Sequence, residues 1–201
     1  GLVVPRPIAW VSTLNEAGAT NLSPFSAFTF CSHKPPMVAI SIGLKDGALL
    51  KDTGNNILRT GEFVVNIVNG ALLDVMHNSS ASVPADVSEA EVLELHQLPS
   101  STIAPTRIAA APACLECKLH VAIPLGEERN VLMIGEVLRF HVNDDLFHDG
   151  KIDTVSLDPV ARLGGPNYAV LGKVIKTPDA ALQTDGGARA LRAGPTRGAS
   201  L

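Results

Sequence analysis

The run Lys51-Asp52-Thr53 carries residue types that can bind an anion. Asp and Thr favour the N-cap of a helix and Gly favours its end, so we predict a short helix with a side-chain N-cap that starts at Asp52-Thr53 and stops at Thr60-Gly61. The N–H groups of a first helical turn attract negative charge, and a neighbouring lysine adds to the attraction. The run therefore indicates an anion site, although an ordinary capped surface helix has the same pattern.

A second motif, Cys114-Leu115-Glu116-Cys117, has the spacing of a redox or zinc site. We predict a strand here, and residues three apart on a strand point to opposite faces. The chain has no second cysteine pair to complete a metal site, so we expect both thiols to pack in the interior. None of the six histidines has a helix-spaced metal partner or an adjacent nucleophile. We predict no catalytic side chain and no metal.

The overall composition limits the partners. Lys and Arg number 16 against 20 Asp and Glu, a net charge of -4, and the basic residues are scattered, so we expect no nucleic acid partner. The longest apolar runs are far shorter than the ~20 residues of a membrane-spanning helix, so we expect a soluble protein with no membrane partner. Three cysteines and no visible secretory signal indicate reduced thiols and, by default, a cytoplasmic location.

Short strands must position these residues. Apolar runs rich in Val, Ile and Phe recur between Gly, Pro and Asn, and we predict strands over 7–13, 21–30, 37–42, 62–68, 114–123 and 131–142. The first runs stand too close together for crossover helices, which favours antiparallel hairpins. Asn15-Glu16-Ala17-Gly18 is predicted to be the first hairpin turn. The expected fold is mainly β with a few helices, a mostly antiparallel barrel.

The remaining segments complete the predicted organisation. Residues 86–98 are acidic with apolar residues at the spacing of a surface helix, and we predict no chemical role for them. The 201 residues, 46% of them hydrophobic, indicate one domain, which we place at 1–176. Residues 177–201 contain few large apolar side chains, so they are predicted to form a flexible C-terminal tail.

Three blocks, in order along the chain, resemble the flavin reductase-like family. The first is Pro5-Arg6-Pro7-Ile8-Ala9-Trp10-Val11-Ser12-Thr13 with Asn21-Leu22-Ser23-Pro24-Phe25-Ser26, where the family more often has Ala in place of Ser23. The second is Ser41-Ile42-Gly43, Lys45, Lys51-Asp52-Thr53 and Thr60-Gly61-Glu62-Phe63. The third is Pro159-Val160-Ala161-Arg162-Leu163-Gly164-Gly165 with Tyr168. The resemblance implies an FMN-binding split β-barrel, flavoredoxin-like in fold.

The resemblance also implies where FMN is held. Its phosphate would bind at the start of the predicted helix, and its ribityl chain and ring edge would contact the small polar residues of the first block. Arg162 could reach the flavin or a partner subunit. The predicted cofactor-binding residues are Ser12, Thr13, Asn21, Leu22, Ser23, Ser26, Ser41, Gly43, Lys45, Lys51, Asp52, Thr53 and Arg162.

Family members usually form homodimers with FMN near the interface, and many reduce flavin with NADH or NADPH. The resemblance therefore implies an NAD(P)H:flavin oxidoreductase, with a transient nicotinamide co-substrate and a monooxygenase as one possible acceptor of reduced flavin. Two alternatives remain open at this point. One is an FMN-binding electron carrier without nicotinamide reductase activity, like flavoredoxin. The other is a barrel that has lost the flavin, against which the retained polar residues argue.

Overall fold

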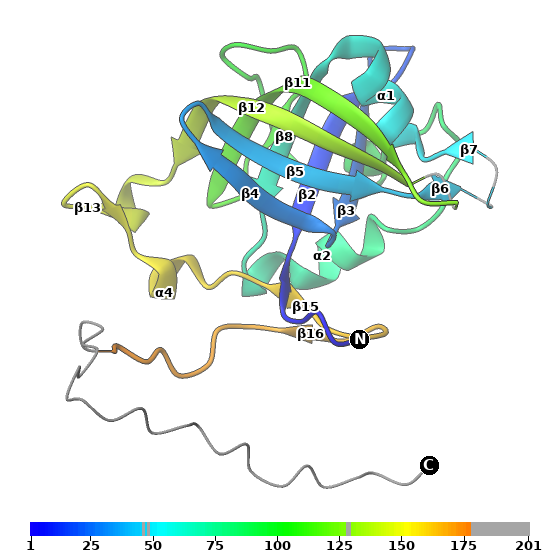
Figure 1. Ribbon diagram of the computed structural model, residues 1–201. Helices are drawn as coiled ribbons and strands as arrows, with labels where there is room; N and C mark the ends of the chain where they lie inside the picture. The colour runs from blue at the N-terminus through cyan, green and yellow to red at the C-terminus, as the bar shows by residue number, and fades with distance from the viewer. Residues whose placement is uncertain (46, 48, 128–129, 178–201) are drawn as a thin grey trace, which may run out of the picture.

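A seven-stranded sheet forms the body of the protein (Figure 1). In this computed structural model, which describes residues 1–45, 47, 49–127 and 130–177, all paired strands of the sheet are antiparallel. The strands lie in the order β3 (Thr20–Phe25), β2 (Ala9–Leu14), β8 (Glu62–Ile67), β11 (Ala113–Leu125), β12 (Asn130–Val142), β5 (Pro36–Ile42) and β4 (Phe28–His33). The prediction of a mainly β, mostly antiparallel fold is confirmed.

The connection between β3 and β4 explains why the sheet curls into a barrel. These two strands lie at opposite ends of the strand order, yet only Ser26 and Ala27 separate them along the chain. The three steps from Phe25 to Phe28 span at most about 11 Å, so the two edges of the sheet must come together. The N–H of Ser41 in β5 donates to the carbonyl of Ala27 at this corner (2.8 Å).

The strand over 21–30 was therefore predicted wrongly as one element. Apolar residues continue on both sides of the corner without a Gly or Asn turn signal between them, so the pattern alone gives no sign of the bend. In the structure β3 ends at Phe25 after pairing with β2, and β4 begins at Phe28 and pairs with β5. The predicted turn from Asn15 to Gly18 is confirmed: the Gly18 N–H donates to the Asn15 carbonyl (3.1 Å), and Gly18 has a φ of 81°.

Two apolar clusters lie on the two faces of the sheet because side chains alternate along each strand. The first cluster contains Trp10, Val64 and Met76, and helix α2 (Leu73–Asn78) packs on it. The second fills the barrel interior around Phe63 and Met133, with other buried members Ala9, Val11, Phe25, Val38, Ile40, Ile42, Ile57, Val65, Cys117 and Val137.

Short elements cover the ends and edges of the barrel. The helices are α1 (Asp52–Thr60), α2 (Leu73–Asn78), α3 (Glu89–Val92) and α4 (Thr154–Leu157), with 3₁₀ turns η1 (Gly70–Leu72) and η2 (Asp144–Leu146). Among the short strands, β15 (Ala161–Arg162) pairs with both β1 (Arg6–Pro7) and β16 (Tyr168–Ala169). The other pairs are β6 (Leu44–Lys45) with β7 (Leu49–Leu50), β9 (Gln97–Leu98) with β10 (Arg107–Ile108), and β13 (Phe147–His148) with β14 (Lys151–Ile152). No helix among the described residues is long and apolar enough to cross a membrane.

The helix predicted over 86–98 is much shorter in the structure. The Ser88 hydroxyl accepts from the Glu91 N–H (3.2 Å) and caps the start of α3, and Glu94, with a φ of 52°, lies just beyond its end. The chain then enters β9. The predicted flexible tail at 177–201 lies outside the described residues from 178 onward.

Candidate functional site

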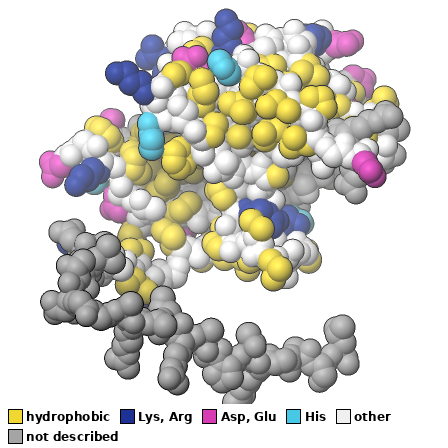
Figure 2. All heavy atoms as spheres, viewed as in Figure 1, with side chains coloured by type: hydrophobic (Ala, Val, Ile, Leu, Met, Phe, Trp, Pro, Cys, Tyr) yellow, Lys and Arg dark blue, Asp and Glu magenta, His cyan; other side chains and the backbone are white. Residues whose placement is uncertain are grey.

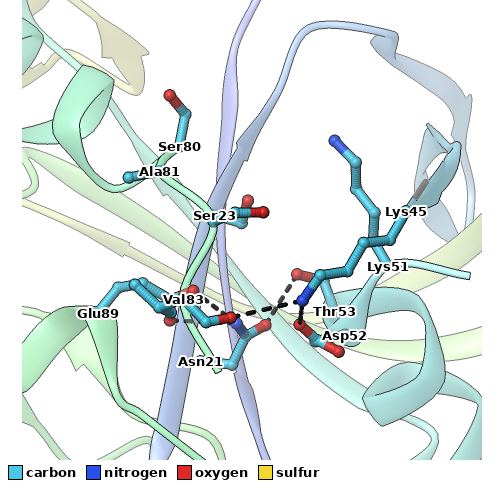
Figure 3. A pocket seen from close by; sticks show the side chains of 11 residues that line it. Asn21, Ser23, Lys45, Lys51, Asp52, Thr53, Ser80, Ala81, Val83 and Glu89 are labelled. Carbon is cyan, nitrogen blue, oxygen red and sulfur yellow. Dashed lines mark hydrogen bonds and ion pairs between the residues drawn. The ribbon is translucent and has the colours of Figure 1, made fainter. Parts of the chain in front are cut away.

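A small hollow lies where β3, the start of α1, the loop after α2 and the start of α3 meet (Figure 3). Its volume is about 70 Å³, roughly the liquid volume of two water molecules. This volume suits a phosphate-sized group and is too small for a flavin ring. The lining residues are Asn21, Ser23, Lys45, Lys51, Asp52, Thr53, Ser80, Ala81, Ser82, Val83 and Glu89.

Two lysines bring positive charge to this hollow. The Lys45 ammonium lies 3.4 Å from an oxygen of Asp52 and 3.4 Å from the carbonyl of Val83. The Lys51 side chain extends away from that ion pair in Figure 3, and its ammonium lies 5.8 Å from the centre of the Phe25 ring. Lys45 shares its charge with Asp52, whereas Lys51 forms no ion pair among the described residues, so Lys51 is the more available of the two cations for an anion.

Helix α1 begins and ends where the sequence predicts, but its cap differs. Lys51 is the N-cap residue, with a φ of -56° and a ψ of 151°, and no side chain caps the first turn. The predicted side-chain N-cap is thus wrong. The Thr53 hydroxyl instead donates to Oδ1 of Asn21 (2.8 Å), because Thr53 is the second helical residue and turns toward β3. Gly61 ends the helix in the left-handed conformation with a φ of 72°, as predicted.

Strand alternation decides which residues of the first block reach the hollow. Asn21 and Ser23 lie on the face of β3 that meets α1, and both line the hollow. Ser12 and Leu22 lie on the opposite face. The Ser12 hydroxyl donates to the carbonyl of Thr106 (2.6 Å), and Leu22 is fully buried in the first apolar cluster.

Thr13 lies beside the hollow, and its hydroxyl donates to Oδ1 of Asn21 (3.2 Å). The other predicted residues lie outside the lining. Ser26 accepts from Nε of Arg6 (3.4 Å), Ser41 lies on β5, and the Gly43 carbonyl accepts from the Lys51 N–H (3.3 Å). Of the thirteen predicted residues, the hollow thus brings together Asn21, Ser23, Lys45, Lys51, Asp52 and Thr53.

Arg162 belongs to a separate cluster on the small β1–β15–β16 sheet. Its guanidinium donates to the Tyr168 hydroxyl (2.7 Å) and lies 4.7 Å from the centre of the Tyr168 ring. The same hydroxyl lies 2.9 Å from Nδ1 of His77. The Arg162 side chain is therefore engaged within its own chain.

Sequence reasoning missed the loop 80–83 and Glu89. The serines of this loop follow α2 directly, and a polar run between a helix and Pro84 is a loop signal that could have drawn attention to it. Glu89 is 7% exposed and accepts from the amide nitrogen of Asn21 at 3.1 Å on each carboxylate oxygen. Glu89 lies in the segment 86–98, for which the sequence predicts no chemical role.

The cysteines lie where the strand argument puts them. Cys114 belongs to the first apolar cluster and Cys117 to the second, so the two side chains point to opposite faces of β11. Both are buried free thiols, and burial raises the pKa of each, that of Cys114 to about 11. The described part of the chain holds no group of three or more His, Cys, Asp or Glu residues arranged for a metal.

Comparison with known proteins identifies the family. Residues 2–156 match the family described as flavin reductase like domain. The chain belongs to this family. A solved structure of nitrilotriacetate monooxygenase component B from Bacillus cereus is 36% identical, with a TM-score of 0.85 over 88% of this chain and 89% of that one. The 2-nitrobenzoate 2-nitroreductase of Pseudomonas fluorescens is 31% identical, with a TM-score of 0.83 over 93% and 91%.

A further structure connects this flavin reductase-like chain with the split barrel. It is a protein of Shewanella frigidimarina named as a flavin reductase with a split barrel domain, 26% identical, with a TM-score of 0.79 over 89% of this chain and 88% of that one. The predicted fold and family resemblance are thus both confirmed.

Proposed function

We propose that this protein binds FMN with the phosphate in the hollow at the start of α1, and that it is an NAD(P)H-dependent flavin reductase. The observation that carries the proposal is the meeting of Lys51, the first turn of α1 and the serines of loop 80–83 in one phosphate-sized hollow. This hollow occurs in a chain of the flavin reductase-like family.

The donors around the hollow suit a phosphate. A dianionic phosphate needs several hydrogen-bond donors and a nearby cation. Ser23 and Ser82 line the hollow together with Lys51, and Ser80, whose hydroxyl donates to the carbonyl of His77 (2.6 Å), borders it as well. The peptide dipoles of the nine-residue α1 place partial positive charge at the same point. Serine hydroxyls and a lysine ammonium can donate hydrogen bonds without requiring the flat hydrogen-bonding edge of a base or ring. Such donors are appropriate for a phosphate group.

When bound, FMN would accept a hydride from a reduced nicotinamide and pass the electrons on. The contribution of the chain is binding and orientation. Lys51 and the first turn of α1 anchor one end of the cofactor, while Ser23 on β3 and loop 80–83 border the hollow from the other side. Fixing one end of a ligand in this way restricts the poses of the remainder, which favours a productive approach of the second substrate. The described side chains need not act as a general base.

We further propose that the protein is a homodimer. Hydrophobic side chains gather over β11 and β12 in Figure 2, where Val121, Ile123, Leu138 and Phe140 are 38–56% exposed. Phe30, 62% exposed, and Phe140 border an apolar hollow of about 290 Å³ between β4, β11 and β12. Large exposed apolar patches mark interaction sites, and a second copy is the partner that every solution of this protein contains.

The similarity to nitrilotriacetate monooxygenase component B supports a partner oxygenase that takes up reduced flavin. The three thiols, exposed at Cys31 and buried at Cys114 and Cys117, are unpaired, which supports the reducing cytoplasm as the location.

A second candidate function is electron transfer through a bound flavin without nicotinamide turnover. The similarity to a 2-nitrobenzoate 2-nitroreductase bears on the acceptor, because that name describes reduction of an organic substrate, and the donor in this alternative is a reduced protein or flavin rather than a nicotinamide.

The test is the protein's spectrum and turnover. Purified protein is mixed with FMN, and NADH or NADPH oxidation is followed at the nicotinamide band under air. The proposal expects FMN binding and steady nicotinamide oxidation that requires the protein. FMN binding without nicotinamide oxidation would favour the electron-carrier alternative, and a protein that ignores FMN would contradict both. Light scattering of the FMN-loaded protein tests the dimer, and a monomer would contradict it.

A further inference from the structure

Glu89 is a buried carboxylate on the wall of a hollow that we assign to an anion. It lies in the first turn of α3 and is 7% exposed. One carboxylate oxygen accepts from the N–H of Leu22 (2.9 Å) and both accept from the amide nitrogen of Asn21. The hydrogen bonds thus join α3 to β3, and the bonded residues are 67 and 68 positions apart along the chain.

These contacts fix the orientation of the Asn21 amide. An ionised carboxylate only accepts hydrogen bonds, so the Asn21 nitrogen must face Glu89 and Oδ1 must face the other way. Oδ1 then accepts from the hydroxyls of Thr53 (2.8 Å) and Thr13 (3.2 Å). Nδ2 of Asn56 donates to the Thr13 hydroxyl (3.1 Å). A continuous polar chain therefore runs from Glu89 through Asn21 to the first turns of α1, and Figure 3 shows its Glu89–Asn21–Thr53 part.

Charge alone gives no reason for a carboxylate at this position. Burial raises the pKa of Glu89, hydrogen bonds from Leu22 and Asn21 oppose the rise, and the negative charge of Asp52 adds to it. A second negative charge beside an anion site also repels the anion. Both its burial and its charge are therefore unfavourable at a phosphate site. The geometry of its hydrogen bonds is the feature that can explain its presence there.

We propose that Glu89 is a positioning residue for the phosphate site: by orienting Asn21 it holds Thr53, and with it the first turn of α1, in the place that binds the phosphate. This inference rests on the proposed function. It differs from a direct contact with the ligand, because Glu89 acts through Asn21.

The variant Glu89→Gln separates position from charge because the two predict opposite signs. Removing a negative charge beside the site would strengthen FMN binding if charge were the only effect. Glutamine, however, presents an NH₂ group to the N–H of Leu22 or the NH₂ of Asn21, so one donor faces another and the Asn21 amide loses its fixed orientation. We expect FMN affinity to fall about tenfold, the loss of one charge-assisted hydrogen bond, while riboflavin affinity changes little.

The matched control is Glu91→Gln, which removes the same charge from an exposed position on the same short helix. It should leave both flavin affinities unchanged. A coupled variant, Thr53→Val, removes the hydroxyl at the far end of the chain. FMN affinity should fall in Thr53→Val, and adding Glu89→Gln to it should cause little further loss, because both substitutions break one chain.

Dissociation constants of FMN and riboflavin, from fluorescence quenching of the full-length protein, decide between outcomes. Equal wild-type affinity for the two flavins would contradict the phosphate placement itself. A wild-type preference for FMN that persists or increases in Glu89→Gln would overturn only the positioning role. If Glu89→Gln does not fold, Glu89→Asp decides: it keeps the negative charge but draws the carboxylate back from Asn21, so an undiminished preference for FMN overturns the role and a lost preference supports it.

Discussion

Two buried glutamates of this protein, Glu116 and Glu89, have surroundings that shift their pKa values in opposite directions. Glu116, fully buried on β11, accepts from the N–H groups of Ser101 and Thr102 (2.7 Å each), from the Thr102 hydroxyl and from Nε2 of His141 (2.6 Å). Burial raises its pKa, but these hydrogen bonds outweigh burial and lower the pKa to about 2. Glu89 has fewer donors and the negative Asp52 nearby, so burial dominates and its pKa is raised.

The difference separates a carboxylate that stabilises the fold from one that shapes a site. Glu116 ties the loop at 101–102 to the barrel with a full set of donors, which is how a buried charge becomes favourable. Glu89 remains under-compensated beside the candidate phosphate site, and strained electrostatics of this kind are typical of functional sites.

The largest expected effect is on stability in Glu116→Gln. The amide cannot accept from all of the donors that face Glu116, so buried donors lose their partner. We expect the free energy of unfolding to fall by about 2–4 kcal/mol, with little change in the preference for FMN over riboflavin. Urea unfolding measures the loss, with exposed Glu127→Gln, at the tip of the same hairpin, as the control. A loss in the free energy of unfolding smaller than that of Glu89→Gln would contradict the assignment of Glu116 to the stability of the fold.

The two glutamates should also respond to pH in opposite directions. The folded pKa of Glu116 is lowered from 4.5 to about 2, so its stabilisation is present above pH 4.5 and is lost as pH falls toward 2. The folded pKa of Glu89 is raised, so its ionisation costs stability as pH rises through that value. Relative to wild type, the deficit of Glu116→Gln should shrink on acidification and that of Glu89→Gln should shrink as pH rises. Deficits that move in the same direction would contradict the two pKa assignments.

A smaller effect is expected from replacing the thiols of β11. Cys114→Ser combined with Cys117→Ser places hydroxyls in two apolar clusters, and we expect a loss of about 1–3 kcal/mol in stability. FMN affinity and any reductase turnover should be unchanged, because neither thiol lines the hollow. Loss of activity in a protein that still folds and still binds FMN would contradict the assignment of these thiols to packing rather than to the site.

The sequence predicts those parts of the fold that depend on local patterns. The hairpin turn ending at Gly18 and the helix stop at Gly61 need positive φ, which few residue types tolerate. Both could therefore be predicted from the glycines in the sequence. The corner at Ser26 could not, because the bend there comes from closure of the barrel rather than from a turn signature. The split barrel itself followed from the three family blocks.

The candidate site was predicted in part for a similar reason. Lys51 and Thr53 stand in one run, and the prediction that they serve an anion site follows from the helix start. Glu89 reaches Asn21 across 68 residues, and no local pattern gives that contact. Ser12 and Thr13 are neighbours in sequence, yet strand alternation sends them to different faces, and family blocks alone do not distinguish the two.

The placement of the phosphate is tested most directly by comparing FMN with riboflavin, which lacks the phosphate, on the wild type and on Lys45→Gln combined with Lys51→Gln. Lys151→Gln, at an exposed position on β14, is the control. We expect FMN affinity to fall about ten- to a hundredfold in the double variant, because charge-assisted hydrogen bonds worth roughly 1.5–3 kcal/mol are lost. Riboflavin affinity should be nearly unchanged. An equal fall for both flavins, or no fall for FMN, would contradict a phosphate site at the start of α1.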